Sequence, residues 1–276
     1  MRLYSLSRLL LGWGIVAGSI LTASDPSTGL RAYQEGDYKT AFREWKAAAE
    51  QGQPNAEYNL AVLYLKGLGV AKDPDEAFRL FRVAADQGLA EAEFRVGQMR
   101  EAGWGSPPNY NEAVLWYQKA ADNGDPEASE SLAELLEEGY GQEPDLKRAV
   151  MRYREAADKG YPAAEYRLGL LTEHGHGVAH DDAATAKLYR AAADQDYDDA
   201  KVRLGMLYER GRGVPQDDKE AYFWFTLASK HGDKAAEHER AEVIKKLRAD
   251  DVQQLEVRAW KWRPKLVAPR NPAIVQ

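Results

Sequence analysis

The chain has 276 residues, of which 44% are hydrophobic and 29% are charged, and its 37 basic and 44 acidic residues give a formal net charge of −7. Such a composition predicts a folded chain with enough apolar side chains for a core. The chain has no cysteine, which excludes disulfides, thiolate metal sites and cysteine nucleophiles. Its acidic balance argues against nucleic acid as a partner, because phosphates require a concentrated basic face.

Residues 1–24 have the pattern of an export signal. Arg2 and Arg8 form a basic start, residues 9–21 are apolar, and small residues follow at 22–24. The apolar stretch is shorter than the roughly 20 residues that span a bilayer, so a retained anchor is the weaker alternative. We therefore expect a periplasmic or secreted protein without stable membrane insertion once the signal is removed.

A period of 36 residues runs through the rest of the chain, and four series of residues keep it. They are single alanines, pairs of glycines, pairs of small residues and single aromatic residues. The alanines are Ala56, Ala92, Ala128, Ala164, Ala200 and Ala236, and the aromatic residues are Trp45, Phe81, Tyr117, Tyr153, Tyr189 and Phe225. Four series in one frame indicate a structural repeat.

Each unit of the period predicts two helices. In the first unit, Ala56, Leu60 and Tyr64 fall on one helical stripe, and Gly67 ends this helix. In the same unit, Asp73-Pro74 supplies the cap and first-turn residue of the second helix. The second helix ends at glycine in every unit except the fourth, where Asp196 stands instead. Small alanines opposite large aromatic rings then allow neighbouring helices to pack closely.

The repeated pattern is Ala-x3-Leu-Gly/Ala-x2-Tyr-x2-Gly-x-Gly-Val followed by Ala-x3-Tyr-x2-Ala-Ala-x2-Gly, and residues 200–232 are its cleanest copy. It resembles the Sel-one-like repeat (SLR) family, a relative of the tetratricopeptide repeats, over about residues 28–262. The resemblance implies an all-α fold: a right-handed superhelical solenoid of stacked antiparallel helix pairs.

The two ends of the repeat array depart from the pattern. Residues 25–55 look like a tetratricopeptide-like capping pair, residues 235–262 like C-terminal capping helices, and residues 263–276, with three prolines, like a disordered tail. Between the caps, the predicted Sel-one-like repeats are five: residues 56–91, 92–127, 128–163, 164–199 and 200–234.

The family resemblance implies a scaffold that holds another protein or an extended peptide in a concave groove, as regulator or assembly factor of an envelope complex. By analogy with tetratricopeptide repeats, the first helix of each pair lines this groove, at positions that the core of the repeat does not require. The predicted groove residues are Tyr58, Val62, Phe94, Gln98, Glu130, Glu134, Glu137, Glu138, Tyr166, Leu170, Glu173, Met206, Glu209 and Arg210.

The third unit places four carboxylates on one helical face, at Glu130, Glu134, Glu137 and Glu138. Like charges at i,i+4 cost about 0.2–0.5 kcal/mol per pair without helping the fold. One hypothesis is an acidic pocket, walled by Phe94 and Tyr166, for a Lys/Arg-bearing segment of a partner. The other is an ordinary solvated helix face.

Two further hypotheses concern the groove. Tyr58, Phe94 and Tyr166 could stack on sugars, so the alternative function is a peptidoglycan- or polysaccharide-binding envelope protein. The basic stretch from Arg258 to Arg270 could instead form a clasp over the acidic groove. The sequence leaves the partner's identity and the oligomeric state open.

Metal binding and catalysis receive little support from the sequence. His174, His176 and His180 are close in sequence, but they fall in and around a variable turn. Residues 194–199 begin like a calcium loop, but the sixth position is not glycine and the twelfth is Gly205, so an inter-repeat turn is the better interpretation. We expect no metal, no cofactor and no enzyme activity.

Overall fold

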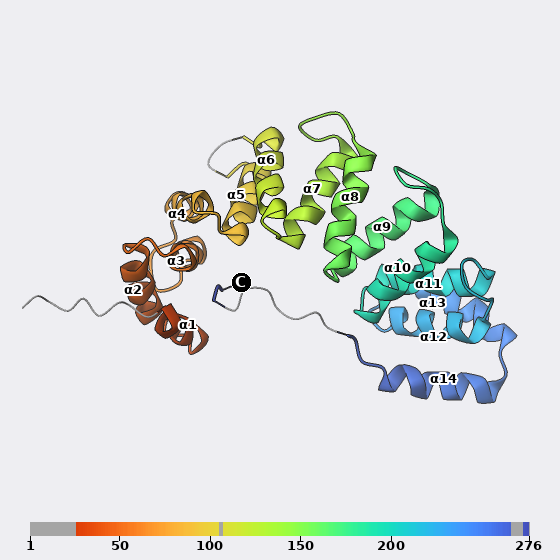
Figure 1. The fold of residues 1–276 in the computed structure, drawn as a ribbon. Coiled ribbons are helices and arrows are strands. Elements are labelled where there is room, and N and C mark those ends of the chain that lie inside the picture. Colours follow the sequence, from red (N-terminus) through yellow and green to blue (C-terminus); the bar gives the residue numbers. More distant parts are fainter. Residues whose placement is uncertain (1–25, 105–106, 266–272, 276) are drawn as a thin grey trace, which may run out of the picture.

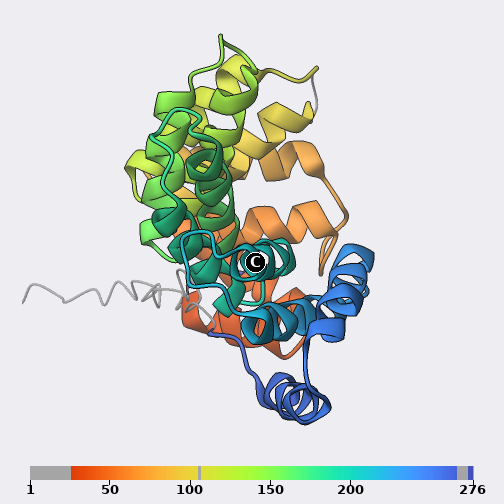
Figure 2. The same ribbon diagram turned by 90° about the vertical axis from the view of Figure 1, so that its right-hand side faces the viewer.

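The computed structural model describes residues 26–104, 107–265 and 273–275, and in these residues the regular structure is entirely helical. Figure 1 shows the helices following one another along an arc, and Figure 2 shows the same arc turned by a quarter. None of the helices in the described ranges is long and apolar enough to cross a membrane.

The array begins with the capping pair α1 (Pro26–Gln34) and α2 (Tyr38–Ala49). The first helices of the repeats are α3 (Pro54–Lys66), α5 (Ala90–Ala102), α7 (Pro126–Glu138), α9 (Pro162–His174) and α11 (Asp198–Arg210). The second helices are α4 (Pro74–Asp86), α6 (Tyr110–Asp122), α8 (Leu146–Asp158), α10 (Asp182–Asp194) and α12 (Asp218–Ser229). The array ends with α13 (Lys234–Val243), the 3₁₀ turn η1 (Ile244–Lys246) and α14 (Ala249–Lys261).

Each helix from α1 to α12 packs against the next one along the chain, which is the arrangement expected of a solenoid. The periodic alanines and aromatic residues form its core: Ala128 and Tyr153, for example, are fully buried. Small residues opposite the rings are required for this packing. A Cβ atom at Gly205 would lie 2.6 Å from the ring of Phe225. The predicted packing of small residues against aromatic rings is therefore confirmed.

The helix ends also follow the predicted chemistry. Gly67 has φ 71° at the end of α3, and Asp196 has φ 75° where the other units use glycine. Asp73 caps α4, because its side chain accepts a hydrogen bond from the backbone N–H of Glu76 at 3.0 Å.

Buried carboxylates join the two helices of a repeat, at positions that were not predicted from the sequence. Each accepts a hydrogen bond from an amide at the end of the following helix: Gln87 to Glu57 (2.5 Å), Asn123 to Glu93 (2.9 Å) and Gln195 to Glu165 (3.0 Å). Burial raises the pKa of all three carboxyl groups, that of Glu165 to about 7. These contacts between the two helices of a repeat therefore depend on pH.

The far end of the array is formed by α13, η1 and α14. Helix α14 packs against α12 and buries Leu255 and Ala259, which covers the last repeat. Of the tail that the sequence predicts to be disordered, residues 263–276, the structure describes residues 263–265 and 273–275. Lys265 forms an ion pair with Asp194 at 2.6 Å, and residues 273–275 lie against α3. Residues 273–275 have no helical structure; the burial of Val275 and the hydrogen bonds of the main chain with Asn59 hold them in place.

Candidate functional site

The first helices of the repeats carry the predicted groove residues, and we call the surface that these residues form along α3, α5, α7, α9 and α11 the groove face. It is marked by the residues three positions after the periodic alanine of each of the five repeats, which follow the same 36-residue step but were not predicted as groove residues. Its members are Asn59, Arg95, Ser131, Arg167 and Arg203. Polar side chains thus run along the groove face from α3 to α11.

Three of the predicted groove residues belong to the core instead. Tyr58, Val62 and Phe94 are only 2%, 4% and 4% exposed. The ring of Tyr58 packs edge-on against Phe81 at 5.1 Å. Its hydroxyl accepts a hydrogen bond from Nε of Arg95 at 3.1 Å. The prediction was wrong for these residues because their side chains pack in apolar clusters, and the cluster of Tyr58 and Val62 also includes Val275 from the end of the chain.

Other predicted residues lie partly at the surface of the groove face. Tyr166, Leu170 and Met206 are half-buried, and the ring of Tyr166 lies 5.2 Å from that of Tyr197. Gln98 is also half-buried and accepts a hydrogen bond from Arg95 at 2.9 Å. These side chains can contact a ligand without leaving their positions.

Tyrosine hydroxyls from the second helices reach carboxylates on the groove face. The pairs are Tyr117 with Glu101 (2.5 Å), Tyr153 with Glu137 (3.0 Å) and Tyr189 with Glu173 (2.7 Å). Burial, together with the partner carboxylate, raises the pKa of each tyrosine, so the hydroxyls remain donors. Glu137 and Glu173 therefore have partners inside the repeat, which corrects the expectation that the core does not require them.

A pocket of about 390 Å³ opens on the groove face between α5, α7 and α9. Its lining consists of Glu101, Glu134, Leu135, Glu137, Glu138, Tyr140, Tyr153 and Arg167. Four of these residues carry carboxylates and one carries a guanidinium, so the pocket is acidic. The predicted acidic pocket exists, but its aromatic walls are Tyr140 and Tyr153, whereas Phe94 and Tyr166 lie outside the lining.

The carboxylates of the acidic pocket are unequally available. Glu134 lies 4.0 Å from the guanidinium of Arg167, and the side chains of both are almost half exposed. Partial burial raises the pKa of Glu134; Arg167 lowers it, and the neighbouring carboxylates of Glu101, Glu137 and Glu138 raise it further. Glu138 is exposed, whereas Glu130 is half-buried and lies outside the lining. Glu134 and Glu138 are thus the residues most open to a ligand.

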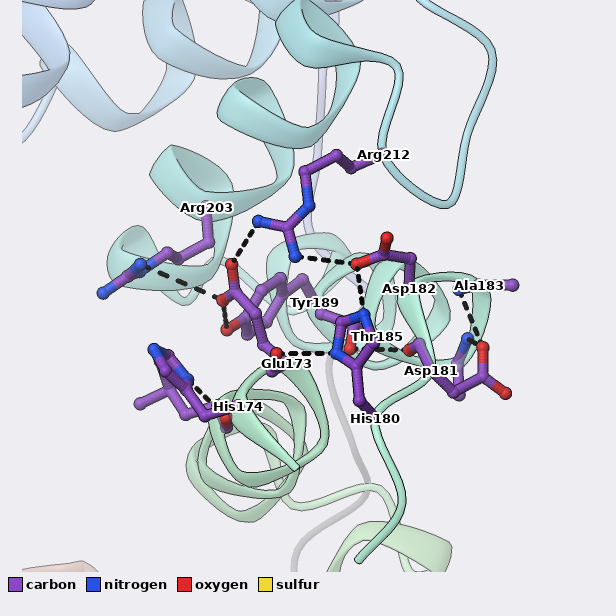
Figure 3. A network of polar contacts seen from close by, with 12 residues as sticks. Glu173, His174, His180, Asp181, Asp182, Ala183, Thr185, Tyr189, Arg203 and Arg212 are labelled. Carbon is purple, nitrogen blue, oxygen red and sulfur yellow. Dashed lines mark hydrogen bonds and ion pairs between the residues drawn. The ribbon is translucent and has the colours of Figure 1, made fainter. Parts of the chain in front are cut away.

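Glu173, the predicted groove residue of the fourth repeat, is enclosed by cations (Figure 3). Arg212 bonds its carboxylate at 3.2 Å and reaches Asp182 at 2.7 Å, while Arg203 lies 3.9 Å from Glu173. Arg212 occupies the variable position of the Gly-x-Gly turn of the fifth repeat, so this network links two repeats. Two arginines thus neutralise the carboxylate of Glu173, whereas the four carboxylates that line the acidic pocket share one guanidinium, that of Arg167.

The last predicted groove residues lie on α11. Glu209 forms an ion pair with Lys246 of the capping segment at 2.7 Å, and Arg210 is exposed. The cap therefore neutralises the carboxylate that the fifth repeat contributes to the groove face.

The residues considered for metal binding have other contacts. Nδ1 of His174 lies 2.8 Å from the backbone oxygen of Leu170, and Nδ1 of His180 lies 2.8 Å from that of Glu173 (Figure 3). Asp196 and Asp198 of the calcium-loop candidate lie close to His231, but the ammonium of Lys201 pairs with both aspartates. Lys201 is 1% exposed, so the lysine supplies the charge that a cation would bring.

Comparison with known proteins places the chain in a family. The Sel1 repeat model matches residues 54–89, 90–125, 126–161, 162–197 and 198–233, starting two residues before each predicted unit. The structure is similar to that of a Sel1 repeat protein from Oxalobacter formigenes, with 32% identity and a TM-score of 0.72, covering 77% of this chain and 87% of that one.

A second solved structure with this architecture is c5321, a protective antigen present in uropathogenic Escherichia coli strains displaying an SLR fold. It is 28% identical with a TM-score of 0.56, and the match covers 86% of this chain and 60% of that one. No curated protein matches the sequence. The matched repeats and the shared solenoid confirm the predicted fold, and the chain belongs to the Sel1 repeat family, a scaffold family whose members generally bind other proteins.

Proposed function

We propose that this protein is an exported scaffold that binds a Lys/Arg-bearing segment of another protein at the acidic pocket, as regulator or assembly factor of an envelope complex. The observation that supports the proposal most is the pocket of about 390 Å³ with four carboxylates between α5, α7 and α9. A single guanidinium, that of Arg167, faces them, so the pocket retains a negative charge that a cationic side chain neutralises.

The dimensions of the pocket agree with a side chain rather than with a whole folded domain. Tyr140 and Tyr153 provide aromatic walls for the aliphatic part of a lysine or an arginine, and the carboxylates of Glu134 and Glu138 reach its charged end. Partial burial strengthens such a pair relative to one in open water, because fewer water molecules screen it. The proposal includes no catalytic step.

Export rests on the sequence of residues 1–24, which lie outside the described part of the structure. The basic start and apolar stretch predict a signal that is removed, and the periplasm or the exterior is the compartment we propose. N-terminal sequencing of the protein recovered from cell fractions tests this part independently. A chain that retains its first residues in the cytoplasmic fraction would contradict it.

A labelled tetralysine peptide tests the pocket. We expect Glu134→Gln/Glu138→Gln to weaken its binding about tenfold, since two charge-assisted contacts are lost. The matched control is Glu35→Gln/Glu237→Gln, which changes the net charge equally at two exposed sites elsewhere. Equal loss of binding in both variants would show that the peptide responds to net charge alone and would refute the pocket.

The alternative function, binding of peptidoglycan or another polysaccharide, loses most of its support. Two of the three aromatic residues that it requires, Tyr58 and Phe94, are buried. Tyr166 is half-buried, and Tyr140 is 49% exposed. Sedimentation with purified sacculi tests this alternative; retention that persists in Tyr140→Ser and Tyr166→Ser variants would not involve the groove face.

A further inference from the structure

Asn59 is the one member of the polar series on the groove face that carries an amide. At the matching positions the later repeats have Arg95, Ser131, Arg167 and Arg203. Asn59 is also only 1% exposed, although it is polar and lies on the inner side of α3. A buried amide requires partners for both its N–H and its oxygen, because an unpaired polar group away from water is costly.

Both partners come from the other end of the chain. Nδ2 of Asn59 donates to the backbone oxygen of Ala273 at 3.0 Å, and the backbone N–H of Val275 donates to Oδ1 at 2.9 Å. One side-chain amide thus binds the two main-chain groups on either side of Ile274. Figure 1 shows this end of the chain, in dark blue, inside the arc near α3.

The segment is also held by its side chains. Val275 is 4% exposed and belongs to the apolar cluster that includes Tyr58, Val62 and Leu63, and Ile274 packs against the same cluster. The site therefore has two parts. The amide of Asn59 recognises main chain of any sequence, and the apolar surface selects an aliphatic residue at the position of Val275.

We propose that the groove face at α3 is a second peptide-binding site and that residues Ala273–Val275 are its resident ligand in the same molecule. A partner segment with an aliphatic residue at the position of Val275 must displace this resident ligand. Because the resident segment is tethered, its effective concentration at the site is high, and it competes with any free segment. This site is independent of the acidic pocket, because it takes an aliphatic residue whereas the acidic pocket takes a lysine or an arginine.

The first experiment uses a labelled peptide with the sequence of residues 271–276, Asn-Pro-Ala-Ile-Val-Gln. In the full chain, Val275→Asp removes the resident valine from the apolar site, so we expect the peptide to bind at least about tenfold more tightly than it binds the unmodified chain. Adding Asn59→Leu to Val275→Asp removes both main-chain contacts, and we expect binding to be lost. Equal affinity in all three proteins would overturn the proposal.

Two controls keep the outcome specific. The same peptide with aspartate in place of the valine must not bind Val275→Asp. Glu134→Gln/Glu138→Gln must leave binding of the valine peptide unchanged, although it weakens binding of tetralysine, so the two sites fail separately. Circular dichroism shows whether the Asn59→Leu variant still folds. If it does not fold, Asn59→Asp replaces it: this variant keeps the acceptor for Val275 but loses the donor to Ala273, and we expect weakened binding.

The second experiment measures hydrogen exchange of the Val275 amide in the unmodified chain. We expect protection because this N–H is bonded to Asn59 and buried, and we expect Asn59→Leu to abolish it. Protection must not change with protein concentration if the contact is made within one molecule. Exchange at the unprotected rate, or protection that increases with protein concentration, would contradict the proposal that residues 273–275 occupy the site within one molecule.

Discussion

The inner face of α3 in the first repeat is closed, whereas that of α7 in the third repeat is open. At matching positions the first repeat has Tyr58, Asn59 and Val62, and the third has Glu130, Ser131 and Glu134. The former three are buried, and Asn59 among them binds the segment Ala273–Val275. The latter three lie at least partly at the surface, and Glu134 among them lines the acidic pocket.

The core beneath the two faces is almost the same. Ala56 matches Ala128, Leu60 matches Leu132, and all four are buried. The repeat therefore fixes where a groove residue stands, and the residue at that position decides which ligand the site accepts. The predictions below test how far the two repeats are equivalent in stability and where they differ.

The largest effect is expected from the shared core. Leu132→Ala and Leu60→Ala each leave a cavity, and we expect each to lower the free energy of unfolding by about 3 kcal/mol. Urea unfolding followed by circular dichroism measures both values. A difference between the two variants as large as the effect itself would show that the first and third repeats do not share an equivalent core.

The next effect concerns the buried carboxylate that bonds to the end of the second helix in the same repeat. The first repeat has this carboxylate at Glu57 and the fourth at Glu165, whereas the third has Ser129 instead. The pKa of Glu165 is raised to about 7 in the folded protein, above its ordinary value of 4.5. The folded state therefore binds the proton more strongly, and stability falls as the pH rises between these two values, by up to about 3 kcal/mol.

Glu165→Gln should remove this dependence. We expect the variant to be more stable than the unmodified chain by about 2 kcal/mol near pH 8, and to differ little near pH 4. Urea unfolding over that pH range measures the slope. Glu138→Gln, at an exposed position, is the control that should leave the slope unchanged, and an unchanged slope in Glu165→Gln would contradict the assignment.

A smaller loss of stability is expected when the hydrogen bond from a tyrosine hydroxyl to a groove-face carboxylate is removed. Tyr153 donates to Glu137 in the third repeat, where the first repeat has Phe81 and Leu65. Tyr153→Phe leaves a half-buried carboxylate without this donor and should cost about 1 kcal/mol. Tyr153→Phe/Glu137→Leu copies the first repeat and should recover most of that loss. A double-mutant cycle measures the coupling, and simple additivity would refute it.

The smallest effect compares the helix starts. Asp125 caps α7 by accepting from the backbone N–H of Ala128 at 2.9 Å, whereas Gln53 at the start of α3 makes no such bond. We expect Asp125→Ala to cost about 1 kcal/mol and Gln53→Asp to stabilise by about 0.5 kcal/mol. Opposite shifts of the thermal midpoint are the expected result. A loss of stability in Gln53→Asp would show that α3 cannot accept this cap.

The acidic pocket could be predicted in part from the sequence. The spacing of Glu134, Glu137 and Glu138 places them on one helical face, and the structure confirms that they line one pocket. The walls could not be predicted, because Tyr140 and Tyr153 lie on a turn and on a second helix whose directions depend on packing. The hydroxyl of Tyr153 on Glu137 likewise depends on how two helices cross.

By itself, the sequence determined the framework of this protein. A 36-residue period with glycine at helix ends and alanine opposite aromatic rings can be satisfied only by stacked helix pairs, because each of these requirements acts over a few neighbouring residues. Only the tertiary structure decided which positions of the groove face are covered. Tyr58 and Phe94 are buried by neighbouring helices, and Asn59 meets Val275 across 216 positions of the chain. Such contacts depend on the curvature of the whole stack, which no local pattern specifies.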